Sequence, residues 1–152
     1  MKLDGDGQMN PAFVPTLVKP LKLGLADCAK GNRFFSPENL EGMPALRLIG
    51  NAALSFMTKF TTGFWNVMDP TNGYTAIHAD ALKKLPLEKI DRGYFFECDI
   101  LFQLNLLRAV VTDVAMDARY RDEISSLRIR VAIFSFPGKF LTRFFKRIFH
   151  QI

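Results

Sequence analysis

Cysteine and histidine are scarce in this sequence of 152 residues, which contains two of each. Cys28 and Cys98 fit neither a zinc-ligand spacing nor a disulfide framework, so we expect a reducing compartment and two small core residues. His78 and His150 belong to no motif, and neither is assigned a role. These absences exclude a zinc-binding module and a disulfide-stapled domain.

Long apolar runs are missing as well. No uninterrupted run reaches the roughly 18 residues that a membrane-spanning helix requires. The first three residues lead directly into Asp4 without an apolar stretch, so we expect no secretory signal. Hydrophobic residues make up 49% of the chain and charged residues 23%, which is typical of a globular protein with one hydrophobic core.

Acidic residues are absent from residues 128–152, although this segment has a net charge of +6. The rest of the chain has 14 basic and 15 acidic residues and a net charge of −1. A nucleic-acid-binding domain spreads its Lys and Arg over a docking face, so we expect no nucleic-acid partner.

Apolar residues of the same basic segment recur at helical spacing: Phe140, Leu141, Phe144, Phe145, Ile148 and Phe149. With cations beside this stripe, the segment is typical of an interfacial helix. We therefore divide the chain into a body, residues 1–127, and a basic amphipathic tail, residues 128–152, that contacts a membrane surface. A helix that packs on a protein core is the alternative.

The remaining pattern mixes helices and short strands, which indicates a layered α/β domain. Apolar spacing and caps predict helices over 11–23, 44–59, 81–85 and 97–107, the third capped by Asp80. Apolar runs predict strands over 25–30 and 109–116, an extended segment over 63–68 and a turn over 69–73.

Two carboxylates, Asp4 and Asp6, stand near the start, with glycines that let the backbone turn tightly around one cation. Such hard oxygen ligands suit Mg²⁺ or Mn²⁺. An EF-hand is excluded, because Met9 and Pro15 stand where that loop requires glycine and an acid. A plain surface Asp-Gly turn is the alternative.

Three further segments carry candidate substrate-binding residues. Lys30 and Arg33 flank a Gly-Asn turn that suits phosphate oxygens. Asp69 and Asn72 lie in the predicted 69–73 turn, which either displays them to a ligand or caps a helix. Arg121 belongs to a charged cluster that either clamps a diphosphate or forms a solvated turn.

Two acids, Glu97 and Asp99, lie within an apolar segment. Buried acids are rarely retained without a partner, so we expect one of them to be either a base with a raised pKa or a carboxylate paired with a cation. At a spacing of i and i+2 they do not share a helix face.

Taken in order, four segments resemble family-two glycosyltransferases of the GT-A fold, in the bacterial branch similar to polyprenyl-phosphate sugar transferases such as dolichol-phosphate mannose synthase. They are residues 2–11, 30–34, 69–74 and 94–99. The resemblance covers nearly the whole chain. It implies the C-terminal part of a GT-A, Rossmann-like domain, with a mixed sheet flanked by helices.

The resemblance also implies a reaction. It is the inverting, metal-dependent transfer of a sugar from a nucleotide-diphosphate donor to a lipid-phosphate or glycan acceptor, in cell-envelope polysaccharide biosynthesis. Asp4 and Asp6 would hold the Mg²⁺ or Mn²⁺, with Gln8 nearby against the substrate. An anionic lipid phosphate needs little base, whereas for a hydroxyl acceptor Asp99 or Glu97 is the candidate base.

Other residues acquire roles by the same resemblance. Asp69 and Asn72 would line the sugar and acceptor side. Arg121 loosely matches a loop arginine that reaches the diphosphate, although the usual spacing to a serine is not kept. The enzyme would be cytoplasmic and peripheral at the inner face of the cell membrane.

The sequence departs from the family's pattern at both ends. In the family a nucleotide-binding half precedes the acid-x-acid motif, and spanning helices commonly follow a basic segment. We therefore expect a chain truncated at both ends that, when isolated, is inactive and binds nucleotide sugar weakly or not at all. The alternative is a non-catalytic fragment that binds a membrane or a partner through its basic, Phe-rich tail.

Overall fold

The computed structural model describes residues 1–2, 10–35, 45–116 and 129–151. Its helices are α1 (Val14–Lys22), α2 (Ala45–Thr62), α3 (Ala79–Lys84), α4 (Phe96–Leu106) and α5 (Ile129–Gln151). Its strands are β1 (Cys28–Asn32), β2 (Thr75–Ile77) and β3 (Val111–Ala115). Short 3₁₀ turns lie at Pro11–Phe13, Arg33–Phe35 and Leu87–Lys89.

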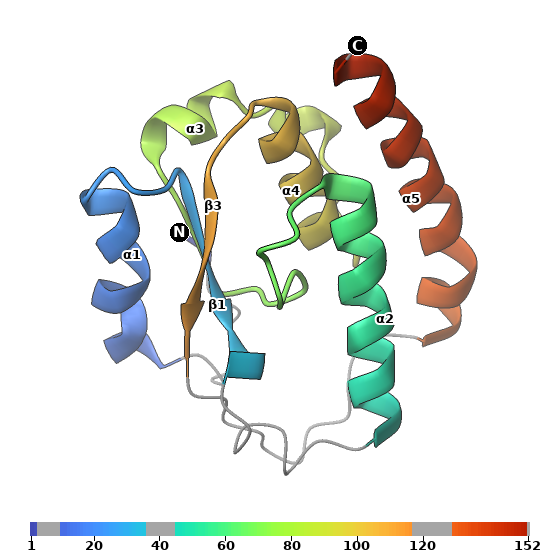
Figure 1. Cartoon of the computed structure of the whole chain (residues 1–152), viewed down its shortest axis with the longest axis horizontal. Helices are drawn as coiled ribbons and strands as arrows, with labels where there is room; N and C mark the ends of the chain where they lie inside the picture. The colour runs from blue at the N-terminus through green and yellow to red at the C-terminus, as the bar shows by residue number, and fades with distance from the viewer. Residues whose placement is uncertain (3–9, 36–44, 117–128, 152) are drawn as a thin grey trace.

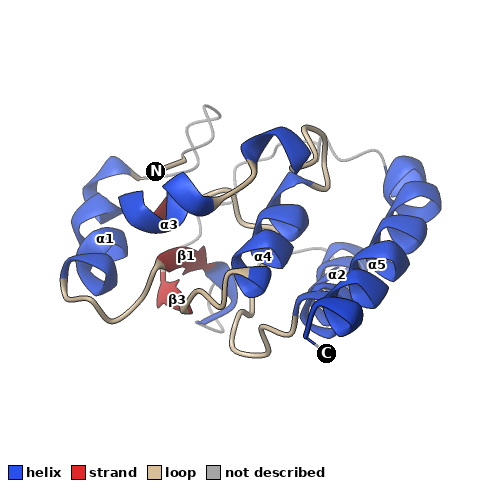
Figure 2. Cartoon of the chain, turned by 90° about the horizontal axis from the view of Figure 1, so that it is seen from above, coloured by secondary structure: helices blue, strands red, loops and turns tan. Residues whose placement is uncertain are grey.

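The three described strands form one mixed sheet in the order β2-β1-β3, in which β1 is antiparallel to β2 and parallel to β3. Helix α1 covers one face of the sheet and α4 the other, and the pair of α2 and α5 lies beyond α4 (Figure 1 and Figure 2). Because both faces are covered, all five residues of β1 are buried.

Each face of the sheet has its own hydrophobic core. Alternate residues of β1 point to opposite faces, so Cys28 packs toward α4 and Ala29 toward α1. The α4 side contains Cys28, Val67, Leu85, Ile90, Ile100, Leu101, Leu104 and Val111. The α1 side contains Leu17, Leu21, Ala29, Tyr74, Ala76 and Met116.

A third cluster joins α5 to the rest of the protein. Phe136 and Phe140 of α5 pack edge-on against Phe95, with ring centroids 5.2 and 5.0 Å away. Phe144 stacks on Phe60 of α2 at 4.7 Å. One side of the tail helix is therefore part of the protein's core, which is the packing that the sequence left as the alternative to a membrane helix.

The predicted α/β class is confirmed, and so are most of the elements. The helices expected over 11–23, 44–59 and 97–107 and the strand over 109–116 all form, with ends shifted by a few residues. Both cysteines are buried core residues, as expected, and burial raises the pKa of each thiol to about 12. The turn at 69–73 is closed by a hydrogen bond from Asn72 N to Asp69 O at 3.3 Å.

Three local predictions are wrong. Residues 63–68 form turns rather than an extended segment, because Gly63 leaves α2 at a φ of +81° and Asn66 Nδ2 donates to Val111 O instead of joining a strand ladder. The first strand begins at Cys28, since Leu25 N still bonds Pro20 O at the end of α1. Helix α3 is capped by His78, whose Nδ1 accepts from Asp80 N, so it starts before Asp80.

The sequence also missed β2, which is only three residues long. None of the described helices combines the length and the apolar character needed to cross a bilayer.

Candidate functional site

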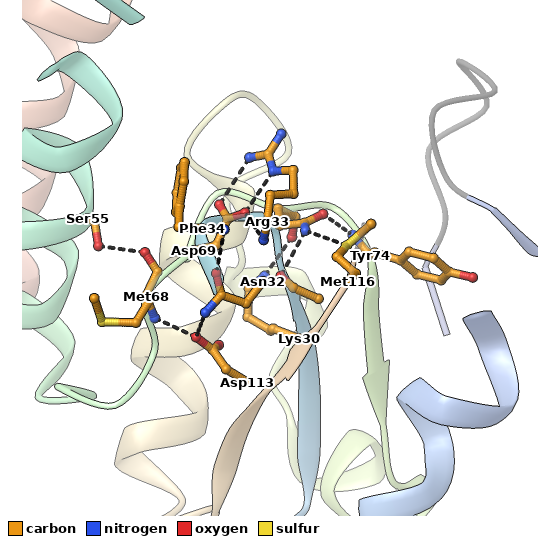
Figure 3. Close-up of polar contacts among 12 residues, drawn as sticks. Lys30, Asn32, Arg33, Phe34, Ser55, Met68, Asp69, Tyr74, Asp113 and Met116 are labelled. Carbon is orange, nitrogen blue, oxygen red and sulfur yellow. Dashed lines mark hydrogen bonds and ion pairs between the residues drawn. The ribbon is translucent and has the colours of Figure 1, made fainter. Parts of the chain in front are cut away.

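The carboxyl ends of the parallel strands β1 and β3 meet at one edge of the sheet, where open α/β sheets bind their ligands. Figure 3 shows that polar side chains from β1, β3 and the 69–73 turn gather there. We call this group the sheet-end cluster; its members are Lys30, Asn32, Arg33, Asp69, Asn72 and Asp113. It includes the predicted substrate-binding residues Lys30, Arg33, Asp69 and Asn72.

An ion pair between Arg33 and Asp69 is the centre of the sheet-end cluster. Arg33 donates from Nε to Asp69 Oδ2 at 2.7 Å and from Nη2 to Oδ1 at 3.0 Å, and its backbone N also donates to Oδ2. The Asp69 side chain is fully buried, whereas the Arg33 side chain is 20% exposed. This two-point geometry fixes the guanidinium plane.

Beneath this pair, Lys30 and Asn72 fix the turn to the strand. Lys30 is fully buried and donates from Nζ to Asn72 O at 2.8 Å and to Thr75 Oγ1 at 3.1 Å. Asn72 in turn donates to Gly31 O and accepts from Tyr74 N. Burial lowers the pKa of Lys30. Its ammonium thus holds the protein's own turn and has no exposed surface to offer a phosphate.

The sequence reasoning missed Asp113, which lies on β3 and bonds the residues that precede Arg33 and Asp69. Its Oδ2 accepts from Asn32 Nδ2 at 2.9 Å and from Met68 N at 2.7 Å. The pKa of Asp113 is raised to about 6, chiefly by burial. The hydrogen bond from Met68 N and the charges of Lys30 and Lys59 lower this pKa, whereas the charge of Asp69 adds to the rise. The available signal was an acid near the carboxyl end of a predicted buried strand.

Glu97 and Asp99 are both paired with cations, which is one of the two predicted alternatives. Glu97 pairs with Lys2. Asp99 is fully buried and accepts from Arg143 Nε at 2.6 Å and Nη2 at 3.0 Å, and from Asp91 N at 2.8 Å. Its bonds therefore connect α4 to α5 rather than to the sheet-end cluster. The role of either acid as a base stays a prediction.

Four other predicted site residues lie outside the described residues: Asp4, Asp6, Gln8 and Arg121. The residues that flank the first three are described, and both are held at the start of β2. Lys2 exchanges backbone hydrogen bonds with Thr75 at 2.8 and 3.2 Å, and Asn10 O accepts from the Tyr74 hydroxyl at 2.9 Å. Thr75 also accepts a hydrogen bond from the Lys30 ammonium, so the Lys2 flank lies next to the sheet-end cluster, whereas the Asn10 flank contacts the far end of the Tyr74 side chain.

The chemistry of this segment fits the expected divalent cation. Asp4, Asp6 and Gln8 offer two carboxylates and an amide oxygen, which are hard ligands that Mg²⁺ and Mn²⁺ accept. Within the described part of the chain, no group of three or more His, Cys, Asp or Glu side chains could hold a metal.

The inner side of the tail helix contacts the protein through cations as well as phenylalanines, whereas its outer side is apolar and exposed. Lys139 pairs with Asp91, and Arg143 with Asp99, so two of its cations bind the protein itself. On the opposite side Leu141, Phe145 and Phe149 are 58%, 48% and 75% exposed. Apolar residues of the neighbouring α2 region are exposed too: Ile49, Phe56, Phe60 and Trp65.

Part of the chain is similar to known proteins. It is 33% identical over 82 residues to the UDP-N-acetylglucosamine–dolichyl-phosphate N-acetylglucosaminyltransferase of Methanococcus voltae, covering 54% of this chain and 32% of that enzyme. It is 29% identical over 115 residues to the undecaprenyl-phosphate mannosyltransferase of Micrococcus luteus, covering 75% and 46%. An uncharacterized protein of Methanocaldococcus jannaschii is 37% identical over 82 residues, covering 54% and 33%.

No protein-family model matches the chain. The matched segments span less than half the length of each of these three relatives. The names of two relatives support a glycosyltransferase family for this chain by resemblance. The observed α/β fold, with a three-stranded mixed sheet flanked by helices, is compatible with part of a Rossmann-like domain of such an enzyme.

Proposed function

We propose that this chain carries the diphosphate-binding and acceptor side of a polyprenyl-phosphate glycosyltransferase of the GT-A fold, which transfers a sugar from a nucleotide-diphosphate donor with inversion. The observation that carries the proposal is the placement of Arg33, held in a fixed plane by Asp69 at the carboxyl end of two parallel strands. The names of the two similar transferases support the same reaction class.

Arg33 has the geometry of a phosphate ligand. Its guanidinium is fully charged, partly exposed and already oriented, so binding an anion requires little loss of side-chain entropy. A positive group fixed beside a leaving nucleoside diphosphate stabilises the charge that accumulates there in the transition state. Arg121 would add a second cation from its loop.

The acid-x-acid segment completes the site in this proposal. Asp4 and Asp6, with Gln8, would hold Mg²⁺ or Mn²⁺, which when bound supplies further positive charge against the donor diphosphate. Support comes from the flanking Lys2, whose backbone pairs with Thr75 next to the sheet-end cluster.

The acceptor that fits best is a lipid phosphate. Its oxygen is already anionic, so it forms the new bond to the anomeric carbon, as the bond to the nucleoside diphosphate breaks, without giving up a proton. This matters because Asp99 accepts two bonds from Arg143 and one from Asp91 N. A glycan hydroxyl acceptor would instead need Asp99 or Glu97 to leave its cation and accept a proton.

The test is the formation of glycosyl lipid by the full chain, supplied with radiolabelled nucleotide sugars, Mn²⁺ and polyprenyl phosphate. We expect any transfer to disappear in the Asp4→Asn, Asp6→Asn double variant. Arg33→Lys keeps the charge but loses the two-point geometry, and should lower transfer at least about 10-fold. Arg143→Lys is the matched control on α5. Transfer that survives the double variant, or transfer that is unchanged in Arg33→Lys, would contradict the proposal.

A second candidate function is peripheral attachment to the inner face of the cell membrane through the outer side of α5. The exposed Leu141, Phe145 and Phe149 favour it, and exposed aromatic residues of α2 extend the same apolar surface. Lys146 is exposed beside them and would favour anionic headgroups.

Sedimentation with anionic vesicles tests this attachment. The double variant Phe145→Ser, Phe149→Ser changes only exposed side chains, whereas removal of the chain from Lys139 onward would also remove Phe140 and Arg143 from the core. We expect the double variant to lose most vesicle binding and Asp4→Asn, Asp6→Asn to retain it. Unchanged binding in the Phe variant would exclude this surface.

A further inference from the structure

Asp113 contacts the residue that precedes each member of the central ion pair. Its Oδ2 accepts from the side chain of Asn32, which stands immediately before Arg33, and from the backbone N of Met68, which stands immediately before Asp69. Figure 3 shows this carboxylate between the end of β1 and the segment that leads into the 69–73 turn. One carboxylate oxygen therefore ties together the two chain segments that carry the pair.

The second oxygen of the same carboxylate is buried and has no hydrogen-bond partner among the described residues. A buried carboxylate oxygen without a donor is costly, so such a group is retained only where its other contacts require it. The charged groups around Asp113 come from three elements: Lys30 on β1, Lys59 on α2 and Asp69 on the turn.

We propose that Asp113 is a positioning residue: in its ionised form it holds the backbone of Arg33 and of Asp69 so that the two side chains meet in their bidentate geometry. The consequence for anion binding rests on the function proposed above, whereas the positioning itself does not. Arg33 is the residue that touches the anion, and Asp113 acts through it.

Protonation is what would release this arrangement. Hydrogen bonds to an ionised acceptor are roughly twice as strong as those to a neutral one, so both donors lose their strong acceptor when Asp113 is protonated. Because its pKa is raised to about 6, this change falls within an accessible range of pH. Arg143 and Asp99 have the same bidentate geometry, and their hydrogen bonds connect them to each other and to Asp91 N, so they serve as an internal control.

The experiment is an NMR titration of the full chain between pH 5 and pH 8, following the Nε–H signals of Arg33 and Arg143 and the carboxyl carbon of Asp113. We expect the Arg33 signal to shift with the same midpoint as Asp113, near pH 6, and the Arg143 signal to stay constant. In Asp113→Asn, which retains an acceptor oxygen but no charge, the Arg33 signal should be independent of pH and match the wild-type signal at pH 5.

Both histidines remain in Asp113→Asn, so the comparison isolates the carboxylate. An Arg33 signal that is constant in the wild type, or that titrates equally in Asp113→Asn, overturns the proposal. If the variant fails to fold, the comparison of Arg33 with Arg143 in the wild type decides alone. The proposed function is tested separately, by the loss of transfer in Asp4→Asn, Asp6→Asn. Transfer that survives in that variant would contradict the proposed function and leave the NMR result standing.

Discussion

Two ion pairs in this protein have almost the same geometry and quite different surroundings. Arg33–Asp69 and Arg143–Asp99 are both bidentate, and in each the carboxylate is fully buried while the arginine side chain is 20% exposed. The first lies among polar groups at the end of the sheet. The second joins α5 to α4, with the Arg143 guanidinium over the ring of Phe102.

The difference shows that a buried arginine–carboxylate pair does not by itself mark a site. Asp99 also accepts a hydrogen bond from the backbone N of Asp91, and the Arg143 guanidinium lies over the ring of Phe102. This pair therefore serves helix packing. Around Arg33, the neighbouring residues make polar contacts: Asn32 and Met68 N donate to Asp113, and Asn72 donates to Gly31 O. The pair therefore lies among polar groups that connect β1, β3 and the 69–73 turn.

The largest expected effect is on stability, and it separates the two pairs. Asp99→Ala leaves the Arg143 charge and the Asp91 N–H without their acceptor, so we expect a loss of about 3–5 kcal/mol in the free energy of unfolding. Urea denaturation followed by circular dichroism measures it. The double variant Asp99→Leu, Arg143→Met should recover much of the loss, because no charge is then left unpaired.

Asp80 is a matched control for this change, because its side chain is 69% exposed and its ion-pair partners among the described residues are its sequence neighbours His78 and Lys83. Asp80→Ala should alter the free energy of unfolding by less than about 0.5 kcal/mol. A loss in Asp99→Ala no larger than that of Asp80→Ala would mean that the α4–α5 pair contributes nothing to docking of the tail helix.

The second effect concerns the pH dependence of stability. The folded protein raises the pKa of Asp113 from 3.8 to about 6, so the folded state binds this proton more tightly than the unfolded state. The wild type should therefore lose stability relative to Asp113→Asn as the pH rises from about 4 to 6, by roughly 3 kcal/mol at most, with a constant difference above that. Urea denaturation of both proteins at several pH values measures it.

Asp91, which pairs with Lys139 and whose backbone N donates to Asp99, should show the opposite pH dependence of stability. Although burial raises its pKa, the hydrogen bonds from Lys139 and Gly93 and the nearby positive charges lower it overall. Its contribution is present above the ordinary pKa of 3.8 and is lost as the pH falls below it. The free energy of unfolding of Asp91→Asn, relative to that of the wild type, should therefore rise as the pH falls. The same trend in Asp113→Asn would contradict the assignment of a raised pKa to Asp113.

A smaller effect is expected at Gly63, where α2 ends against α5. Alanine there would be strained at a φ of +81°, and its Cβ would lie 2.6 Å from Arg147 Nη1. Gly24 has a φ of +66° with open space around it, so Gly24→Ala measures the backbone strain alone. We expect a loss of about 1–2 kcal/mol in thermal or urea unfolding for Gly24→Ala, and a larger one for Gly63→Ala. Equal losses would show that Arg147 moves aside freely.

The smallest effect is expected for Lys139, whose side chain is 41% exposed and pairs with Asp91. Lys139→Met keeps the aliphatic stem over the Phe95 ring and removes the charge, so we expect a loss of about 0.5–1 kcal/mol. High salt should reduce the difference between the two proteins. A loss as large as that of Asp99→Ala would mean that the outer pair, rather than the buried one, holds α5.

The helices were predictable because their apolar period spans many residues. The 97–107 pattern gives several independent contacts with the core, through Ile100, Leu101 and Leu104. The 44–59 pattern repeats along the whole segment, although Ile49 and Met57 are exposed, so a shift of a residue or two does not alter either assignment. The three residues of β2 carry no such period, and their place beside β1 is set by tertiary pairing. The same holds for residues 63–68, where one glycine conformation decides the path.

At the candidate site, residue type was easier to predict than partnership. Turn chemistry identified Arg33, Asp69 and Asn72, but their spacing in the sequence does not reveal that Arg33 and Asp69 form one pair. Lys30 is predicted to bind phosphate because it is a cation near a Gly-Asn turn, whereas it is buried because both faces of the sheet are covered around β1, which the local sequence does not show. Asp113 was missed because strand 109–116 alone does not show what lies beside it.

The most direct test of the central claim uses Mn²⁺ as a paramagnetic probe on the full chain. If Asp4 and Asp6 hold the cation beside the sheet-end cluster, substoichiometric Mn²⁺ will broaden the amide signals of Arg33 and Asn72 strongly and those around Arg143 weakly, and Asp4→Asn, Asp6→Asn will abolish the broadening. Broadening around Arg143 as strong as that at Arg33, or broadening at Arg33 that persists in the double variant, would contradict the account.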